Sequence, residues 1–296
     1  NSSMKNFIMI GASGYIAPKH FEAIKKTKNN LVAAYDVSQT AGKIDSYFQN
    51  CKYFFDFKEF KKHVTKIKKT KRIHFLVICT PNYLHFKYIK FGLINKFEII
   101  CEKPLVLSSN HLLKITNLEK KYKTKVNCIM QLRLNNKLIN TKKKIEKKIN
   151  NNPKKVFEGH INYITFRGDW FLKSWKGNQN KSGGLTTNIG IHLFDLLSWY
   201  FGEYEEFKIY SSSPVENKGV LFFKNAKISW LISISSKYLK KGVGAKRELI
   251  LDKERIQLSD NFNDLHIKSY DEILKNKGFS SLDVFSSIKL TEKLRG

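Results

Sequence analysis

Short apolar runs alternate with segments of helical periodicity from the N-terminus to about Gln131. The runs are KNFIMIG, NLVAAYD, IHFLVICTP, FEIICEKP and KVNCIMQ, and the stretch APKHFEAIKKT after the first of them has helical spacing. Strands that alternate with helices are typical of a parallel sheet with crossover helices. The pattern therefore predicts an α/β domain over residues 4–128.

The pattern changes after a very basic stretch, residues 142–155, which we expect to be an exposed helix and linker. From KVFEGHINYITFRG onward the strands are longer and alternating, with turn signals such as KKGVG between them. One helix, TNIGIHLFDLLSWYFG, interrupts them, and SSLDVFSSIKLTEKLRG predicts a closing amphipathic helix. We expect a second, α+β domain over residues 129–296 with a mostly antiparallel sheet, and the closing helix is free to pack back on the first domain.

Composition narrows the class of protein. The chain has 296 residues, 42% of them hydrophobic, which favours two folded domains and excludes general disorder. Its 54 Lys+Arg against 25 Asp+Glu give a net charge of +29. The lysines are scattered, so we interpret the charge as compositional bias as much as a binding face, and nucleic acid is not the expected partner.

Cysteine spacing and hydropathy indicate the compartment. Cys51, Cys79, Cys101 and Cys128 form neither a CxxC pair nor a metal-ligand spacing, as expected for thiols in a reducing compartment without a metal. No apolar run approaches the ~20 residues that span a bilayer, and no signal peptide is visible. We expect a cytoplasmic protein with no membrane partner.

The stretch IMIGASGYIAPKH places Gly11 and Gly14 between the first strand and the first helix. Small residues there let the backbone approach a pyrophosphate at a helix N-terminus. The motif is irregular, with Ser13 in place of a glycine, and a simple tight turn is an equal alternative. Asp36 ends the second strand 22 residues after Gly14, where an acid binds the ribose 2′-hydroxyl. Since no arginine follows it, we predict NAD rather than NADP.

Two later strands end in polar turns. CTPNYLH, Cys79 to His85, could be a helix start or part of a ligand edge, where parallel strands end. CEKP ends the next strand, and a surface salt bridge would be the simplest explanation of Glu102 and Lys103. Neighbouring strand residues point to opposite faces, however, so one charge can face a cofactor and the other a substrate.

These motifs, with the later Gly190-x-His192-x-x-Asp195, resemble the Gfo/Idh/MocA oxidoreductase family over nearly the whole chain. The resemblance implies a Rossmann dinucleotide-binding domain followed by an open-faced sheet used for substrate and oligomer contacts. It also implies that Lys103 is presented to the substrate beside the nicotinamide. The expected cofactor contacts are Gly11, Ala12, Ser13, Gly14, Tyr15, Ile16, Asp36, Thr80, Pro81, Asn82, His85, Glu102, Lys103, Gln131 and Trp170.

A narrower resemblance covers residues 11–36, 161–202 and 262–274. These blocks are similar to bacterial UDP-N-acetyl-2-amino-2-deoxyglucuronate dehydrogenases, which oxidise the 3-hydroxyl of UDP-N-acetylglucosaminuronic acid for O-antigen (lipopolysaccharide) sugars. Asn188 stands where other members of the wider family carry an aspartate, in agreement with the narrower group. The resemblance implies a homotetramer, and some relatives recycle NADH with 2-oxoglutarate, which the sequence leaves open.

Alcohol oxidation needs a base for the hydroxyl proton and a nicotinamide that accepts the hydride. His192 is the candidate base, although a histidine in an apolar helix is more often a satisfied core residue. Lys103 would hydrogen-bond the same hydroxyl, and its alternative is an ordinary exposed lysine. Which of the two takes the proton stays open.

A UDP-sugar acid carries a diphosphate and a carboxylate, so its ligands should be cationic and forked. Tryptophans offer flat faces for the rings, or are ordinary core or interface residues. The expected substrate contacts are Lys103, Arg133, Arg167, Lys173, Trp175, Lys176, Asn188, His192 and Tyr270, with Lys181 and His266 nearby. Two other interpretations stay open: an oxidoreductase of another sugar or polyol, and a non-catalytic nucleic-acid-binding protein on the same fold.

Overall fold

The structure is a computed structural model, and residues 3–259 and 264–296 are described from it. The chain divides into two compact units. The first runs to Val106 and adds Asn110–Met130 and Asp264–Val284. The second takes Leu107–Ser109, the described chain from Gln131 to residue 259, and Phe285–Gly296.

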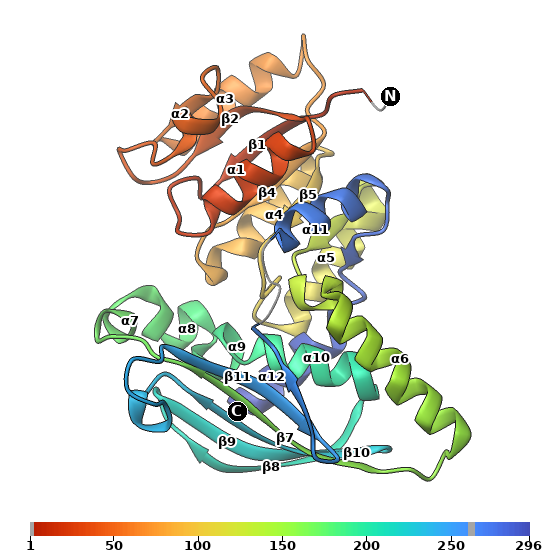
Figure 1. Cartoon of the computed structure of the whole chain (residues 1–296). Helices are drawn as coiled ribbons and strands as arrows, with labels where there is room; N and C mark the ends of the chain where they lie inside the picture. Colours follow the sequence, from red (N-terminus) through yellow and green to blue (C-terminus); the bar gives the residue numbers. More distant parts are fainter. Residues whose placement is uncertain (1–2, 260–263) are drawn as a thin grey trace. The chain divides into compact units, whose positions relative to one another are not determined.

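The first unit is built on a seven-stranded sheet in the order β13-β6-β5-β4-β1-β2-β3 (Figure 1). Every neighbouring pair is parallel except β13 with β6. The strands are β1 Asn6–Ile10, β2 Asn30–Tyr35, β3 Lys52–Phe54, β4 Phe75–Ile78, β5 Glu98–Cys101, β6 Val126–Cys128 and β13 Phe279–Ser280.

Helices connect these strands and cover the sheet. They are α1 Ala17–Lys26, α2 Ile44–Tyr47, α3 Phe57–Ile67, α4 His85–Ile94 after the 3₁₀ turn η1 Asn82–Leu84, α5 Ser109–Tyr122 and α11 Leu265–Leu274. Residues 7–10 of β1 and all of β4 are buried, as expected for parallel strands covered on both faces. This explains why the sequence shows continuous apolar runs rather than alternation here.

The second unit contains a six-stranded sheet in the order β12-β11-β7-β10-β9-β8. Only β7 and β10 are parallel among its described pairs, and the others are antiparallel. The strands are β7 Phe157–Thr165, β8 Tyr204–Ser212, β9 Glu216–Phe223, β10 Ala226–Ser233, β11 Ala245–Leu251 and β12 Glu254–Gln257.

Helices α7 to α10 and α12 lie on one face of this sheet and leave the other face open (Figure 1). The helical segments of the unit are η2 Gln131–Leu134, α6 Asn136–Asn151, α7 Trp170–Lys173, η3 Trp175–Gly177, α8 Gln179–Ser182, α9 Gly184–Asn188, α10 Ile191–Phe201, η4 Ser236–Tyr238 and α12 Phe285–Arg295.

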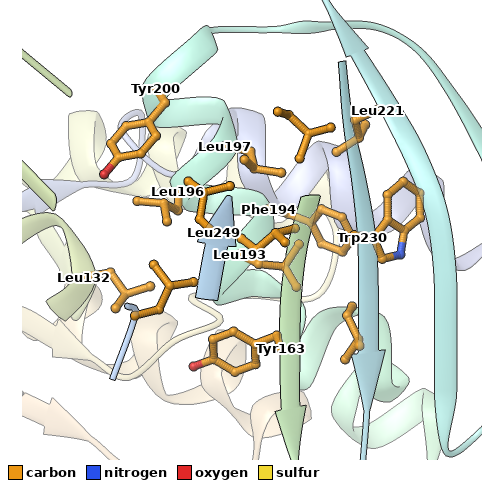
Figure 2. Packing of buried hydrophobic residues seen from close by; sticks show 14 of the residues in the cluster. Leu132, Tyr163, Leu193, Phe194, Leu196, Leu197, Tyr200, Leu221, Trp230 and Leu249 are labelled. Atoms are coloured by element: carbon orange, nitrogen blue, oxygen red, sulfur yellow. The ribbon is translucent and has the colours of Figure 1, made fainter. Parts of the chain in front are cut away.

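The core of the second unit lies between α10 and the sheet, as Figure 2 shows. Leu193, Phe194 and Leu197 of α10 face Leu221 and Trp230, all of them almost completely buried. The ring of Phe194 meets that of Trp230 edge-on, with 5.3 Å between their centres. This apolar layer explains why the α10 segment is hydrophobic over nearly its whole length.

The division of the chain differs in one place from the contiguous domains expected from the sequence. Residues 264–284 belong to the first unit, because Leu265, Tyr270 and Ile273 of α11 are buried there and α11 packs on α1. The closing helix α12 belongs instead to the second unit, where it packs on α10 and α9. In the described ranges, no helix is both long enough and apolar enough to span a membrane.

Candidate functional site

The loop from Gly11 to Ile16 leaves the carboxyl end of β1 and enters α1. Gly11 has φ +89°, and its N–H donates a 2.8 Å hydrogen bond to the carbonyl of Tyr35. A Cβ on Gly11 would lie 2.5 Å from the carbonyl carbon of Cys79 and 2.6 Å from the nitrogen of Thr80. Two strand ends therefore approach so closely here that only glycine fits. Tyr15 in the same loop is 95% exposed.

Asp36 follows β2 and is tied to this loop. Its Oδ2 accepts a 2.9 Å hydrogen bond from the Ser13 N–H, and its Oδ1 accepts one of 3.1 Å from the Ser38 N–H. The Ser13 hydroxyl donates to the carbonyl of Thr40 over 2.8 Å. A half-buried carboxylate fixed beside a glycine loop at a helix start fits the ribose of NAD, and its charge would repel a 2′-phosphate.

Thr80, Pro81 and Asn82 follow β4 at the same sheet edge, and Asn82 is 5% exposed. His85, expected to contact the cofactor, is fully buried. Its Nδ1 lies 2.7 Å from the carbonyl oxygen of Pro104, and its Nε2 lies 3.0 Å from that of Thr80. The ring thus connects two turns of the sheet edge, a position that does not fit direct contact with a ligand.

Glu102, Lys103 and Pro104 follow β5, and the Lys103–Pro104 peptide bond is cis. Glu102 is 7% exposed and belongs to a buried polar cluster with two histidines. Its Oε1 lies 2.7 Å from Nε2 of His20 in α1 and 2.8 Å from Nε2 of His266 in α11. The other ring nitrogen of His20, Nδ1, lies 2.8 Å from the hydroxyl of Tyr270.

The position of Tyr270 corrects one expectation. The side chain has no exposed surface, and its hydroxyl bonds to His20, so it does not fit a direct substrate contact. Its neighbour His266 is 8% exposed and bonds to Glu102. The first two residues of the block 262–274 lie outside the described residues.

Electrostatics favour an ionised Glu102 and a neutral His20. Burial alone would raise the pKa of Glu102, but the hydrogen bonds from His20 and His266 hold that pKa well below its ordinary value. Burial lowers the pKa of His20 and outweighs the opposite effect of Glu102. Among the described residues, His20, Glu102 and His266 also form the group that could hold a metal ion, with their ligand atoms within 4.8 Å of one another.

In the second unit, Gln131 begins η2, directly after β6 and its short connection. Its Oε1 is buried and accepts no hydrogen bond from any described residue. A buried carbonyl oxygen without a donor is costly, so a ligand N–H or O–H would stabilise this position. This fits the expectation that Gln131 contacts the cofactor or the sugar.

Arg133, expected to bind substrate, is 8% exposed and makes a bidentate pair with Asp195 of α10. Its Nε and Nη2 donate to the Asp195 carboxylate over 2.9 and 2.7 Å. The guanidinium also lies 6.0 Å from the centre of the Trp199 ring. The guanidinium thus uses two of its N–H groups inside the fold, and this ion pair explains why Asp195 is buried.

His192 lies in the first turn of α10, half-buried, with its ring stacked at 5.8 Å on that of Tyr163. Asn188 ends α9 and is 9% exposed. The two residues are therefore on consecutive helices of the second unit, whereas Lys103 belongs to the first unit.

Cationic and aromatic side chains gather in the segment from Arg167 to Lys181. The Nζ of Lys176 lies 5.3 Å from the Trp170 ring centre and 5.9 Å from that of Trp175. Trp170 is 54% exposed. Burial, and then the charge of Arg167, lowers the pKa of Lys176, and an anion bound here would favour the charged form of this lysine. Lys173 ends α7, and Lys181 lies in α8.

His20 was not expected at the site. It lies three residues into α1 and nothing in the local pattern distinguishes it from a surface residue of an amphipathic helix. Its contact with Glu102, 82 residues away, depends on the packing of α1 over the end of β5. The glycine loop immediately before α1 is the only signal in the sequence that places His20 near the edge.

Comparison with known proteins identifies relatives of both units. Residues 5–129 match the Gfo/Idh/MocA description "Oxidoreductase family, NAD-binding Rossmann fold". Residues 142–244 match its companion, "Oxidoreductase family, C-terminal alpha/beta domain". These matches confirm the predicted fold class and are consistent with the predicted NAD cofactor.

A curated relative, glucose-6-phosphate 3-dehydrogenase of Bacillus subtilis, is 28% identical over 217 residues, which are 68% of this chain. The match spans about half, 54%, of that relative. A solved structure, the WlbA (WbpB) dehydrogenase from Thermus thermophilus in complex with NAD and UDP-GlcNAcA, is 32% identical with a TM-score of 0.94. That match covers 99% of this chain and 95% of the other.

The same Thermus thermophilus enzyme in complex with NAD and alpha-ketoglutarate matches equally well, at 32% identity, TM-score 0.94 and the same coverage. The WlbA dehydrogenase from Bordetella pertussis in complex with NADH and UDP-GlcNAcA is 17% identical, with a TM-score of 0.80. That match covers 99% of this chain and 95% of the other, and it shows the common fold.

Proposed function

Because the chain belongs to the Gfo/Idh/MocA oxidoreductase family, we propose that it oxidises the 3-hydroxyl of UDP-N-acetylglucosaminuronic acid with NAD. The observation that carries this proposal is the match at 32% identity, over 99% of the chain, to a dehydrogenase bound to NAD and UDP-GlcNAcA. The product would be the 3-keto UDP-sugar, an intermediate suited to amination on the way to diamino-uronic acid sugars of O-antigens.

The cofactor site would be formed by the first unit. The loop from Gly11 to Ile16 would receive the pyrophosphate, Asp36 the ribose hydroxyls, and Thr80 to Asn82 the rest of the sheet edge. When bound, NAD accepts a hydride from the carbon that carries the hydroxyl. Gln131 of the second unit is a further proposed cofactor contact, since its buried Oε1 accepts no hydrogen bond within the described ranges.

Oxidation also releases the hydroxyl proton, and we assign Lys103 and His192 to it. One accepts the proton as the base, and the other hydrogen-bonds the same oxygen and stabilises its developing negative charge. A half-buried imidazole suits the base at neutral pH, and an ammonium suits charge stabilisation. This places the base on α10 and the ammonium on the turn after β5.

The substrate's negative charges would be met by the segment from Arg167 to Lys181. Arg167 and Lys176 provide a forked donor and a point charge, and Trp170 and Trp175 provide flat faces for the rings. Asn188 would hold the acetamido or carboxylate group. Arg133 has an indirect role in this scheme because Asp195 already takes its forked donors.

Three further assignments accompany the reaction. The Thermus thermophilus complex with alpha-ketoglutarate supports 2-oxoglutarate as the acceptor that regenerates NAD. The open face of the six-stranded sheet supports a homotetramer. The four cysteines, all described, are free thiols, which supports a cytoplasmic location.

A second candidate, oxidation of another sugar at its 3-hydroxyl, is favoured by the Bacillus subtilis glucose-6-phosphate 3-dehydrogenase match. The two candidates differ in what binds beyond the reacting ring. Of the two, only the UDP-sugar carries both a diphosphate and a carboxylate, so only it needs the cationic and aromatic segment from Arg167 to Lys181 for both groups.

The decisive experiment incubates the purified protein with NAD and UDP-N-acetylglucosaminuronic acid, with and without 2-oxoglutarate, and follows NADH and the sugar by mass spectrometry. We expect a 3-keto UDP-sugar, and kcat reduced at least a hundredfold in Lys103→Ala and His192→Ala. Turnover of glucose 6-phosphate without turnover of the UDP-sugar would replace the proposal with the second candidate. Folded variants with wild-type turnover would refute the assignment of the two residues.

A further inference from the structure

Two histidines hold the carboxylate that immediately precedes Lys103. Both Nε2 atoms, of His20 and of His266, lie within hydrogen-bond distance of the same oxygen, Oε1 of Glu102, at 2.7 and 2.8 Å. The second oxygen, Oε2, accepts a 3.3 Å hydrogen bond from the backbone N–H of Lys103. One carboxylate therefore connects α1 and α11 to the peptide that carries Lys103.

The hydrogen atoms of this cluster are fixed by its chemistry. An ionised Glu102 only accepts hydrogen bonds, so both Nε2 atoms must carry protons. His20 is then neutral with an unprotonated Nδ1, which accepts the hydrogen bond from the Tyr270 hydroxyl at 2.8 Å. Every donor meets an acceptor, as a buried polar network requires.

The cluster is almost completely buried, which suits a structural role next to Lys103 better than contact with a ligand. His20 and Tyr270 have no exposed surface, and Glu102 and His266 are 7% and 8% exposed. Three elements contribute, and one of them, α11, comes from the segment that returns to the first unit late in the chain. Such an arrangement fixes the direction of a neighbouring side chain without touching a substrate.

We propose that His20, Glu102 and His266 are positioning residues that hold the Lys103 peptide in the orientation needed for hydride transfer from the sugar. The kinetic test of this inference rests on the proposed function, whereas the hydrogen-exchange test does not. The Glu102 carboxylate links the two histidines to Lys103. Its Oε1 accepts hydrogen bonds from both imidazoles, and its Oε2 accepts one from the Lys103 N–H.

The same three side chains could bind a metal ion, but the hydrogen bonds explain their distances without one. Nitrogen-to-oxygen separations of 2.7 and 2.8 Å are those of charge-assisted hydrogen bonds. Elemental analysis of the purified protein separates the two possibilities. One equivalent of a transition metal, lost in His266→Gln, would overturn the positioning role.

The kinetic test compares His266→Gln with His266→Phe. Glutamine keeps a donor near the position of Nε2, whereas phenylalanine keeps the ring but donates nothing. We expect His266→Phe to lower kcat at least tenfold while KM and the Kd for NAD change less than about threefold, and His266→Gln to recover most of kcat. Wild-type kcat in His266→Phe, or equal losses in both variants, would overturn the proposal.

His74→Phe is the matched control, because it replaces another first-unit histidine that takes part in a hydrogen bond, here as the acceptor from the Asn6 N–H, at a position outside the Glu102–Lys103 turn. It should lower the Tm without lowering kcat. If His266→Phe does not fold, Tyr270→Phe replaces it, since it removes only the hydroxyl that fixes the His20 tautomer. We expect a several-fold loss of kcat at unchanged KM, and wild-type kcat in Tyr270→Phe would count against the proposal.

Hydrogen exchange at the Lys103 amide tests the same idea without any substrate. The amide should exchange slowly in the wild type and in His266→Gln, and at least tenfold faster in His266→Phe. If the UDP-sugar is not turned over but exchange changes in this way, only the proposed substrate fails. If the sugar is turned over and exchange in His266→Phe equals that of the wild type, the positioning role fails.

Discussion

At Gly11 the geometry of the candidate site depends on the absence of one atom, the Cβ that every other residue carries. The residue turns the chain at φ +89° in a place where a Cβ would meet backbone atoms of Cys79 and Thr80 at 2.5 and 2.6 Å. Neither backbone can move without disturbing β4. The glycine therefore sets the separation between two strand ends.

Replacing Gly11 by alanine should impair both stability and cofactor binding. We expect Gly11→Ala to cost about 2–4 kcal/mol of the free energy of unfolding and to weaken NAD binding at least tenfold, since the loop must move outward. Calorimetric titration with NAD and thermal unfolding measure the two effects.

Gly42→Ala is the control for backbone strain. Gly42 has a similar positive φ of +63°, but its Cβ would have 3.7 Å to the nearest atom. It should cost only about 1 kcal/mol and leave NAD affinity unchanged. Equal losses of NAD affinity in the two variants would show that φ, and not the close approach, matters.

The sequence predicts residues at strand ends better than residues on helices. Gly11, Asp36 and Glu102 lie directly after β1, β2 and β5, as predicted, because each follows a buried run and the parallel strands end at one edge. Arg133 was expected to bind substrate from its charge alone, and its pairing with Asp195, 62 residues later, is a tertiary contact. Local sequence does not specify such a contact, and the same holds for Tyr270 with His20.

Asp195 connects α10 to two other helical segments of the second unit, η2 and α12. Its carboxylate receives the guanidinium of Arg133 in η2 and a 2.7 Å hydrogen bond from the Ser287 hydroxyl in α12. Asp195 is 1% exposed. Because α10 also carries His192, this connection orients a helix that holds a proposed catalytic residue.

Removal of this carboxylate should be severe. Asp195→Ala leaves a buried guanidinium without its partner, and we expect a loss of about 3–5 kcal/mol in the free energy of unfolding. Ser287→Ala removes one hydrogen bond and should cost about 1 kcal/mol. Denaturation in urea measures both, and comparable losses in the two variants would contradict a dominant role for the ion pair.

Two buried histidines, His20 in α1 and His85 at the start of α4, make stability depend on pH. Burial is the main cause that lowers the pKa of both His20 and His85. Below pH ~6.5 the unfolded chain binds protons that the folded chain does not, so stability falls as pH decreases, by up to about 1.4 kcal/mol per pH unit for each histidine. Glu102 adds to the loss below pH ~4.3, where the unfolded carboxylate is protonated first.

Thermal unfolding at pH 7.5, 6.5 and 5.5 checks this dependence. The Tm should fall between pH 6.5 and 5.5 and change little above pH 7. His85→Gln removes one of the two groups and should reduce the fall in Tm clearly. A fall of the same size in His85→Gln and wild type would assign the pH dependence to other groups.

The two-part organisation and the fold class of the molecule were both predicted from periodicity and motifs, and the family matches confirm the fold class. Periodicity alone did not show that residues 264–284 join the first unit, because an apolar helix face does not specify the core on which it packs. The net charge of +29 is larger than one anion-binding site requires, and the lysines that cause it are spread over both units.

The open face of the six-stranded sheet leads to a prediction about assembly. Leu231 lies between Trp230 and Ile232, which are buried in the core, so its side chain points to the open face. We expect the wild type to have about four times its chain mass of 34.5 kDa in light scattering, and Leu231→Glu to form smaller species.

Leu113→Glu serves as the control, because Leu113 is 54% exposed on α5 of the first unit. It should leave the assembly unchanged. A monomeric wild type, or a tetramer that tolerates Leu231→Glu, would contradict assembly through the open face.

The discontinuity of the first unit determines the order in which the protein is completed during its synthesis. A ribosome adds about 5–20 residues per second, so α11 emerges on the order of ten seconds after β6. Until then the apolar face of α1 and the Glu102 carboxylate lack their partners from α11. A prematurely ended chain therefore never completes its nucleotide-binding half, and it exposes apolar surface that chaperones and proteases recognise.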